Sequence, residues 1–466
     1  MGLSVNTNVA SLTAQHNLNR TSSALNKSIE RLSSGLKINR GADGPAGLVI
    51  SEKNRAQIAG LNAAIENASK AVSVVQTAEG ALNEVNSLLT RVRSLAIDSA
   101  NTGVNDADAL AANQAEITNA LDTINRIANN TQFGERSLLD GSAGRSGQAS
   151  DVDVTVLSTT TNTTEGNYAV AISTAAERAN LTAGTQQTAV LATDEDLTVN
   201  GVVISLSAGL SAAQVIDRVN EFTSETGVVA EDNTGLRLRS VNHGANESVS
   251  AISNVAAAAS SSGIGTALVN DTGVDIVGTI DGLAASGSGN LLTANSGAAN
   301  GLSLSIADAS TTTTATGAQG SVTVVDNSLV FQIGANQNQT VSVGVDQVNP
   351  SSLGVGVAGN QFANLGEITV TSAAAAQDAL AVIDAAINEV ASARGDLGAF
   401  QANTLESTAN NLRTTLENTV SAESVIRDTD FAQEIAEFTK NQVLVQAGTS
   451  TLGNANQSAQ LVLSLL

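Results

Sequence analysis

The strongest constraint in this sequence is a pair of long apolar stripes with helical spacing, carried by both ends of the chain. Near the N-terminus, mainly apolar residues follow three- and four-residue steps from Leu18 to Leu36, with Ser22 filling one position, and again from Ile58 to Val92, where Ala68 and Glu79 are part of the stripe. Residues with this spacing share one face of an α-helix. The string GADGPAG (Gly41 to Gly47) lies between the two stripes and predicts a break between two helices.

The second of these predicted helices, from about Pro45 to Ala100, would be roughly 80 Å long at 1.5 Å per residue. A helix of that length needs partners along its whole side. After Leu82 the next apolar step is again three residues, to Val85, which predicts a local phase change. A third helix follows the turn NTGVND, with Asp106 or Asp108 as its N-cap.

The C-terminal part mirrors this pattern, with stripes from Leu380 to Leu397 and from Leu405 to Val420. The last segment keeps a seven-residue repeat through Phe431, Ile435, Phe438, Gln442, Val445, Thr449, Leu452, Asn456, Ala459, Leu463 and Leu466. Polar residues in such a seam lower stability and can fix its register. An intramolecular bundle would explain the stripes, but their length and their position at both extreme ends favour assembly with other subunits.

Composition removes several classes of function. The net charge of -23 argues against binding nucleic acid or anionic lipid. The absence of cysteine excludes disulfides, thiolate metal sites and cysteine nucleophiles. Aromatic residues, which dominate most binding pockets, make up only 2% of the chain. No run of 18 apolar residues predicts membrane insertion, and the length of 466 residues predicts two to four domains.

The middle of the chain has a different character. Residues 146–375 contain 20 acidic residues against four arginines and no lysine. Alternation typical of strands occurs at Asp151 to Leu157, Tyr168 to Ser173, Leu197 to Leu206, Gly235 to Val241, Ser321 to Val325 and Leu329 to Asn336. One helix is predicted at Ser211 to Glu225. These patterns predict a β-rich region of one or two subdomains with an acidic, solvent-facing surface.

Enzymatic motifs are missing. The chain has no H-E-x-x-H, P-loop, G-x-S-x-G or EF-hand string, and its two histidines, His16 and His243, are far apart. The acidic run from Asp194 to Asp196 could hold Ca²⁺, but a solvated turn is the favoured interpretation in so acidic a chain. We therefore expect no catalytic residue, no metal and no cofactor.

Specific strings then give a family resemblance. The N-terminal string ERLSSGLKIN (Glu30 to Asn39) and the block QTAEGALNEVNSLLTRVRSLAIDSAN (Gln76 to Asn101) resemble bacterial flagellins, as does NTQFGERSLLDG (Asn130 to Gly141). At the other end, ESVIRDTDFAQEIAEFTKNQVLVQAGTSTLGNAN (Glu423 to Asn456) is similar to the flagellin C-terminus. The resemblance covers about half of the chain, at both ends and in order. Within the middle, residues 197–240 resemble a strand–helix–strand insert motif of some flagellins.

The resemblance implies a fold and a domain plan. The fold is multidomain, with an all-α coiled-coil and helical-bundle core built from both termini and a β-rich α+β insert. Residues 1–43 and 430–466 would form an inner-core coiled coil, residues 44–145 and 376–429 a helical rod, and residues 146–375 a surface-exposed insert. The implied function is that of a structural subunit that polymerises into the flagellar filament used for swimming, with no enzymatic activity.

The resemblance also implies partners and site residues. The partners are copies of the chain itself in a helical polymer, the hook–filament junction proteins, the filament cap, and an export chaperone on the C-terminal helix, with type III export as the route out of the cell. Nucleic acid and the membrane are not among them. The expected assembly seam consists of Leu25, Ile29, Leu32, Leu36, Phe431, Ile435, Phe438, Val445, Leu452, Leu463 and Leu466.

A Toll-like receptor of innate immunity recognises some flagellins. Arg91, Leu95 and Glu116 match the residues that it contacts, whereas Thr90 and Ser94 depart from the usual glutamine and glutamate. Simple subunit packing is an equally good explanation of this block. A hook–filament junction protein is the main alternative for the whole chain. The sequence does not distinguish an extracellular filament from a periplasmic one.

Overall fold

The computed structural model describes residues 8–101, 103–310, 312–357 and 359–463, with side chains up to residue 457. The chain divides into two compact units. The first comprises Met1–Ser69, Gln332–Thr340 and Glu406–Leu466, and the second comprises Lys70–Phe331 and Val341–Leu405. The predicted fold class, helical termini around a β-rich middle, is confirmed.

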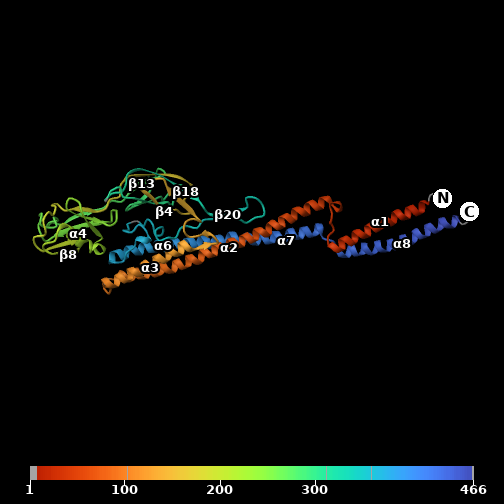
Figure 1. Cartoon of the computed structure of the whole chain (residues 1–466), viewed down its shortest axis with the longest axis horizontal. Helices are drawn as coiled ribbons and strands as arrows, with labels where there is room; N and C mark the ends of the chain where they lie inside the picture. Colours follow the sequence, from red (N-terminus) through yellow and green to blue (C-terminus); the bar gives the residue numbers. More distant parts are fainter. Residues whose placement is uncertain (1–7, 102, 311, 358, 464–466) are drawn as a thin grey trace. The chain divides into compact units, whose positions relative to one another are not determined.

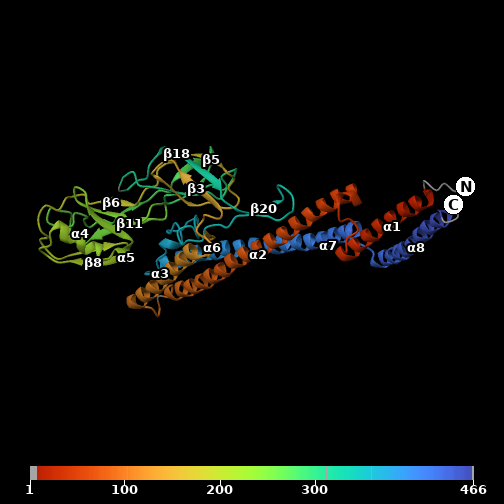
Figure 2. The same ribbon diagram turned by 45° about the vertical axis from the view of Figure 1, so that its right-hand side comes forward.

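The first unit is helical. Helices α1 (Val9–Ser34) and α8 (Phe431–Leu463) lie side by side (Figures 1 and 2). Asn8 caps the start of α1 by accepting a hydrogen bond from the Ser11 backbone N–H, and Gly35 ends it at φ +72°. The short 3₁₀ helix η1 (Gly41–Asp43) and α7 (Ser407–Arg427) also belong to this unit.

Helix α2 (Pro45–Ser99) has nearly the predicted bounds. Proline is tolerated at its first position because the N–H that it lacks would have no helical partner there. Its buried stripe runs through Leu61, Ala64, Ala68, Ala71, Val75, Ala78, Leu82, Val85, Leu89, Val92 and Ala96. These positions alternate three- and four-residue steps throughout, so the predicted phase change near Leu82 is wrong. Ala64, Ala71 and Ala78 are buried in this stripe, whereas Ile65 and Val72 are only half-buried.

In the second unit, α2 packs with α3 (Ala107–Asn130) and α6 (Ala373–Ala399). Asp106 is the N-cap of α3, one of the two predicted candidates, and accepts a hydrogen bond from the Ala109 backbone N–H. A bidentate pair between Arg93 and Asp384 joins α2 to α6. A π-helical segment, η3 (Phe400–Glu406), continues α6 into α7. No helix in the described part of the chain is both long enough and apolar enough to cross a bilayer.

The middle region contains two antiparallel β cores. The first core has a three-stranded sheet in the order β6-β10-β9 and a four-stranded sheet in the order β12-β11-β7-β8, with α4 and α5. Its elements are β6 (Asn180–Thr182), β7 (Glu195–Val199), β8 (Val202–Leu206), α4 (Ala212–Asn220), α5 (Thr223–Thr226), β9 (Val228–Asp232), β10 (Leu236–Ser240), β11 (Ser248–Ser253) and β12 (Val269–Thr272).

The second core has a five-stranded sheet in the order β14-β13-β5-β18-β3 and a four-stranded sheet in the order β15-β16-β17-β4. Its strands are β3 (Arg145–Ala149), β4 (Val154–Ser158), β5 (Gly166–Thr174), β13 (Val277–Ile280), β14 (Leu283–Ala284), β15 (Ser286–Ser288), β16 (Leu291–Thr293), β17 (Ser303–Ile306) and β18 (Gly317–Asp326). Two short hairpins, β1 (Gln132–Phe133) with β2 (Arg136–Ser137) and β19 (Leu329–Gln332) with β20 (Thr340–Val343), and the 3₁₀ helix η2 (Leu365–Glu367) complete the chain.

The strand predicted at Leu197 to Leu206 is in fact a hairpin. Asn200 and Gly201 both have positive φ, at 49° and 84°, as a two-residue type I′ turn requires. The Asn200 side chain donates to the Thr226 and Ser248 carbonyls and accepts from the Ser250 N–H, which holds the turn against the rest of the first core.

Candidate assembly interface

The contact between α1 and α8 has few large apolar side chains at its centre. Among the side chains described in these two helices, only Ser28, Glu434 and Asn441 are buried, and all three are polar. Gly448 lies against Leu18, because a Cβ built on this glycine would come within 3.3 Å of the leucine Cδ1. Near the far end of the pair, Asn8 donates to the Ala455 carbonyl and the Ser11 hydroxyl donates to Asn456 Oδ1 at 2.7 Å.

The structure places the predicted seam residues in two groups. Leu25, Leu32, Leu36, Phe438, Val445 and Leu452 are half-buried. Ile29, Phe431 and Ile435 are about half exposed, at 48%, 53% and 53%. The side chain of Leu463 and the whole of Leu466 lie outside the described residues. The half-buried leucines, phenylalanine and valine therefore flank the polar centre of the pair, whereas Ile29, Phe431 and Ile435 point elsewhere.

A short backbone clasp joins the two chain segments beside this pair. The Lys37 N–H donates to the Arg427 carbonyl at 2.6 Å, and the Thr429 N–H donates to the Gly35 carbonyl at 2.9 Å. Leu36 and Asp428 form an antiparallel bridge between these two bonds. The clasp fixes the register between the end of α1 and the start of α8, although the two segments are almost 400 residues apart in sequence.

Ion pairs surround the clasp. Arg31 of α1 lies 3.4 Å from Glu434 of α8, and Arg427 lies 3.2 Å from Glu52 of α2. The Ser51 hydroxyl donates to Glu423 at 2.7 Å. Lys27 lies 2.7 Å from Asp43, and its hydrogen bond is the largest of the effects that hold the pKa of that carboxyl below its usual range. No sequence pattern pointed to the first three of these contacts, since their partners are more than 370 residues apart in the chain.

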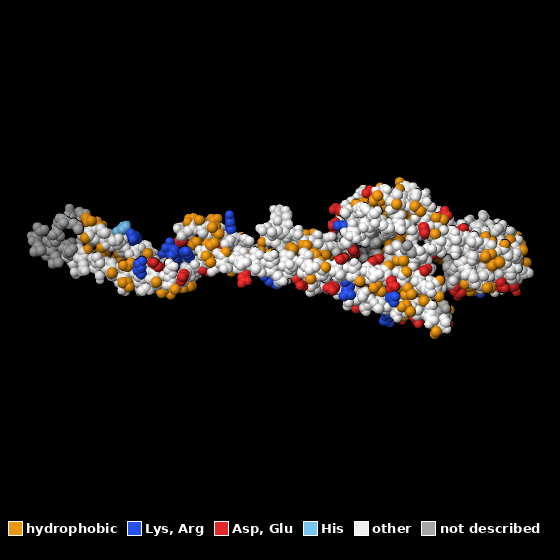
Figure 3. Space-filling view, turned by 180° about the vertical axis from the view of Figure 1, so that it is seen from behind, with side chains coloured by type: hydrophobic (Ala, Val, Ile, Leu, Met, Phe, Trp, Pro, Cys, Tyr) orange, Lys and Arg blue, Asp and Glu red, His pale blue; other side chains and the backbone are white. Residues whose placement is uncertain are grey.

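Apolar side chains remain exposed on the same helices. In α1 they include Val9, Leu12 and Ile29; in α8 they are Phe431, Ile435, Val443 and Leu444. Figure 3 shows this hydrophobic surface along the terminal helices. Clustered exposed apolar side chains are a common feature of protein–protein contact sites.

Of the residues expected to contact an immune receptor, Arg91 and Glu116 meet across α2 and α3. Arg91 Nε donates to Glu116 at 2.7 Å, and both side chains are well exposed. Leu95 lies one turn after Arg91 on α2 and is half-buried. Among the described residues, no group of three potential metal ligands converges.

Comparisons with known proteins agree with the helical termini. Residues 5–144 match the model of the bacterial flagellin N-terminal helical region, and residues 380–466 match that of the bacterial flagellin C-terminal helical region. Relatives match over nearly their entire length. B-type flagellin of Pseudomonas aeruginosa is 34% identical to this chain, and the alignment covers 100% of both chains. Flagellin of Salmonella choleraesuis is 33% identical with 99% of both chains covered, and flagellin D of Vibrio anguillarum is 32% identical with 100% of both.

The chain belongs to the bacterial flagellin family. As a flagellin it is a structural subunit of the flagellar filament, and its role is in motility. Flagellins are structural proteins rather than enzymes. The family therefore makes the exposed helical surface, rather than a cleft, the candidate functional site.

Proposed function

We propose that this chain polymerises with copies of itself through α1 and α8 into a helical filament that lies outside the cell. The observation that carries the proposal is the polar centre of the α1–α8 pair, in which no described apolar side chain is fully buried. Two helices of this kind bury too little surface to be stable alone. Neighbouring copies would cover the apolar side chains that the pair leaves exposed.

The distribution of these side chains around α8 supports contacts with more than one neighbour. Successive residues of a helix are rotated by about 100°. Val443 is two residues from both Asn441 and Val445, which lie on the side packed against α1, so it points roughly the opposite way. Phe431 and Leu444 lie to either side of that direction. An interface that repeats without closing, as in a helical polymer, needs such separate contact surfaces on one subunit.

A polymerisation assay tests this proposal. Purified protein is seeded with filament fragments and the products are counted by electron microscopy. Val443→Asp should prevent elongation, while its exposed position should leave the free energy of unfolding of the monomer within about 0.5 kcal/mol. The matched control is Val152→Asp, at a valine of the insert that is 93% exposed. Normal filaments from the Val443→Asp variant would contradict the proposal.

The remaining partners rest on the family and on the same surfaces. The exposed apolar side chains of α8 would suit an export chaperone that shields the helix before assembly, and the ends of the filament would meet the junction proteins and the cap. Pull-down of a chaperone by wild-type protein, lost when residues 431–466 are deleted, tests the first of these contacts. A chaperone that binds the truncated chain equally well would remove α8 from the proposal.

We also propose recognition by a Toll-like receptor through the exposed Arg91–Glu116 pair and Leu95. The pair supports this because both side chains are exposed and present a cation and an anion together between α2 and α3. Receptor-reporter cells should respond to the monomer, and Arg91→Ala should weaken the response. The control is Arg126→Ala, at an arginine of α3 that forms no ion pair among the described residues. A wild-type protein that is inert in this assay would contradict the proposal.

A further inference from the structure

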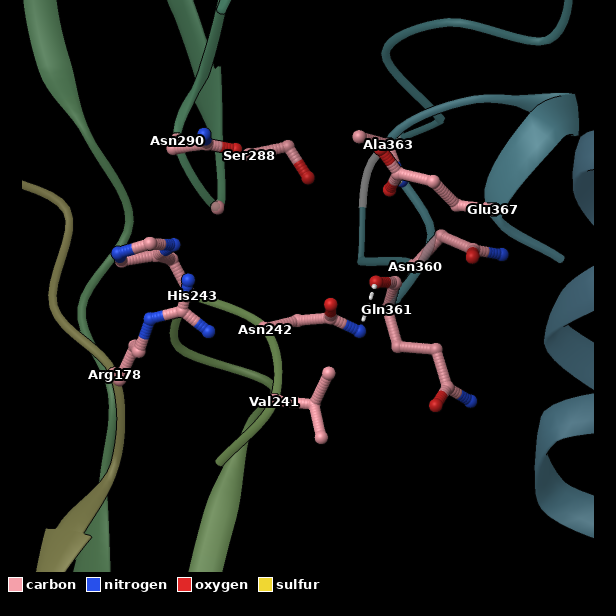
Figure 4. Close-up of a pocket in the computed structure, with 11 residues that line it drawn as sticks. Arg178, Val241, Asn242, His243, Ser288, Asn290, Asn360, Gln361, Ala363 and Glu367 are labelled. Carbon is pink, nitrogen blue, oxygen red and sulfur yellow. Dashed lines mark hydrogen bonds between the residues drawn. The ribbon is translucent and has the colours of Figure 1, made fainter. Parts of the chain in front are cut away.

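A polar cavity of about 170 Å³ lies in the second unit, where four separate chain segments meet (Figure 4). Arg178 follows β5, the segment from Val241 to His243 follows β10, and the segment from Ser288 to Asn290 joins β15 to β16. The fourth side is the segment from Asn360 to Glu367, which leads into η2. Nothing in the assembly interface uses this cavity.

One wall of the cavity is electrically balanced. Arg178 Nη2 lies 3.1 Å from Asp308 Oδ2, and His243 Nε2 lies 2.6 Å from Asp308 Oδ1. Burial, together with the nearby Arg178, lowers the pKa of His243 against the opposing effect of Asp308, which favours the neutral imidazole. The arginine charge is thus offset by the aspartate, and the wall offers no net attraction to an anion.

The amide side chains of the cavity have a fixed orientation. Asn242 Nδ2 donates to the Gln361 backbone carbonyl at 3.2 Å, and Asn290 Nδ2 donates to the Ile306 backbone carbonyl at 3.1 Å. Because a backbone carbonyl can only accept, neither amide can be turned around without losing its bond. The Oδ1 atoms of both residues have no hydrogen-bond partner within the described part of the chain.

The free polar atoms are mostly acceptors. Figure 4 shows the side chains of Asn242 and Ser288 directed into the space between the Arg178–His243 wall and the segment that contains Glu367. The Ser288 hydroxyl has no protein partner in the described structure and can either donate or accept. The Glu367 carboxylate already accepts from Asn364 and Ala363. A complementary ligand must therefore donate several hydrogen bonds and accept at least one, as hydroxyl groups do.

The charge and the shape of the cavity exclude further classes of ligand. A bare divalent cation would need six to eight oxygen ligands, but Glu367 is the one carboxylate among the lining residues and a guanidinium lies opposite. Val241 is 40% exposed and provides an apolar surface beside the amide oxygens. A sugar ring combines hydroxyl groups at its edge with an apolar C–H face. The volume lies below the roughly 300 Å³ at which pockets for drug-sized ligands begin, and so suits a single ring.

We propose that this cavity binds an uncharged, hydroxyl-rich ligand: one sugar ring, either free or at the end of a glycan. Asn242 Oδ1, Asn290 Oδ1 and Ser288 Oγ form hydrogen bonds with its hydroxyl groups, and Val241 packs against its C–H face. The residues of this site lie in the middle region, between residues 178 and 367. The proposal is therefore independent of polymerisation through α1 and α8.

The experiment uses the full-length monomer in saturation-transfer difference NMR with a panel of free hexoses and N-acetylhexosamines. At least one sugar should receive saturation. Ser288→Ala removes one hydrogen bond of a neutral pair, and should weaken binding roughly two- to tenfold. Ser288→Trp fills the cavity and should abolish binding. Ser286→Ala, at an exposed serine of the same strand and outside the cavity, should bind as the wild type does.

Three further measurements make the test decisive. Circular dichroism and thermal unfolding establish that each variant is folded; if Ser288→Trp is not, Val241→Asp replaces it as the blocking change. A glycan array distinguishes a free sugar from the terminal sugar of a glycan as the ligand. Binding to glycans on the array without binding to free sugars also supports the proposal. The proposal fails if neither responds, if Ser288→Ala and the folded blocking variant bind as the wild type does, or if the cavity binds spermidine or Ca²⁺ and no sugar.

Discussion

The terminal helices and the β-rich middle bury their apolar side chains to different extents. In the first β core, 17 hydrophobic residues are buried around strands β7, β8 and β10 and helix α4. In the α1–α8 pair, the buried described side chains are one serine, one glutamate and one asparagine. The middle region thus completes its cores within one chain, whereas the helical pair does not. This difference supports the proposal that the middle region folds alone while the terminal helices are completed by other copies of the chain.

The largest expected effect comes from removing residues 443–466. Without this part of α8 the surfaces proposed for assembly are lost, and polymerisation should be abolished. The β cores belong to the other compact unit and should remain folded. Seeded growth followed by electron microscopy measures the first result, and circular dichroism of the β signal measures the second. Filaments of normal length from the truncated chain would refute the assignment of α8 to the assembly contact.

A pair of leucine substitutions compares the two regions directly. Leu238 is completely buried in β10, and Leu238→Ala should lower the free energy of unfolding of the first β core by about 2–5 kcal/mol. Leu25 is only half-buried in the monomer, so Leu25→Ala should cost less there but should slow filament growth more. Denaturant titration and seeded growth measure the two quantities. Equal effects of both substitutions in both assays would remove the distinction between the regions.

Much of the contrast between the terminal helices and the β-rich middle could be predicted from the sequence, because the spacing of apolar residues along the chain indicates helix or strand. The bounds of α2, the N-cap Asp106 and the β-rich character of the middle all followed from periodicity and capping residues. The buried stripe of α2 was harder to predict. Ala64, Ala71 and Ala78 occupy it in place of the larger Ile65, Val72 and Glu79, because close helix packing favours small side chains that carry little apolar signal.

Long-range pairs could not be predicted at all. Arg31 and Glu434 are separated by 403 residues, and no spacing rule connects them. The lining of the sugar-sized cavity is drawn from four segments, so its amide side chains appeared only as ordinary loop residues. The same holds for the clasp at Leu36 and Asp428, which depends on the register that the fold sets between the two ends.

A pH titration tests the folded middle region. Burial, and secondarily the Asp378 carboxylate, raise the pKa of Glu247 to about 7, against the smaller opposing effect of Arg178. The folded state therefore favours the protonated form. The resulting stability is fully present below the unfolded pKa of 4.5 and is lost as the pH rises towards 7. Glu247→Gln should remove this dependence and should raise stability at pH 8 by at most about 3 kcal/mol.

Thermal unfolding between pH 4 and pH 8 measures that effect. Glu225→Gln, at an exposed carboxylate of α5, is the matched control and should leave the pH profile as it is in the wild type. A Glu247→Gln variant with the wild-type profile would show that this carboxyl does not contribute to the pH dependence.

The smallest expected effect is at the ion pair between α1 and α8. Glu434→Gln removes the charge that faces Arg31 and should destabilise the pair by about 1 kcal/mol, as for a partly exposed ion pair. The effect should shrink at high salt, where charges are screened. Glu437→Gln, at the more exposed carboxylate beside Lys440, should have less effect. The concentration of monomer left at the end of seeded growth reports both changes; equal values for the two variants would argue against a role for Arg31 and Glu434.

Hydrogen–deuterium exchange of the same protein as monomer and as filament tests the central claim most directly. In the monomer, the amides of α1 and α8 should exchange quickly, and those of β7, β10, β5 and β18 should be protected. In the filament, α1 and α8 should become protected while the β strands change little. Terminal helices already as protected in the monomer as in the filament would contradict the account, because their pairing would then be complete without other copies.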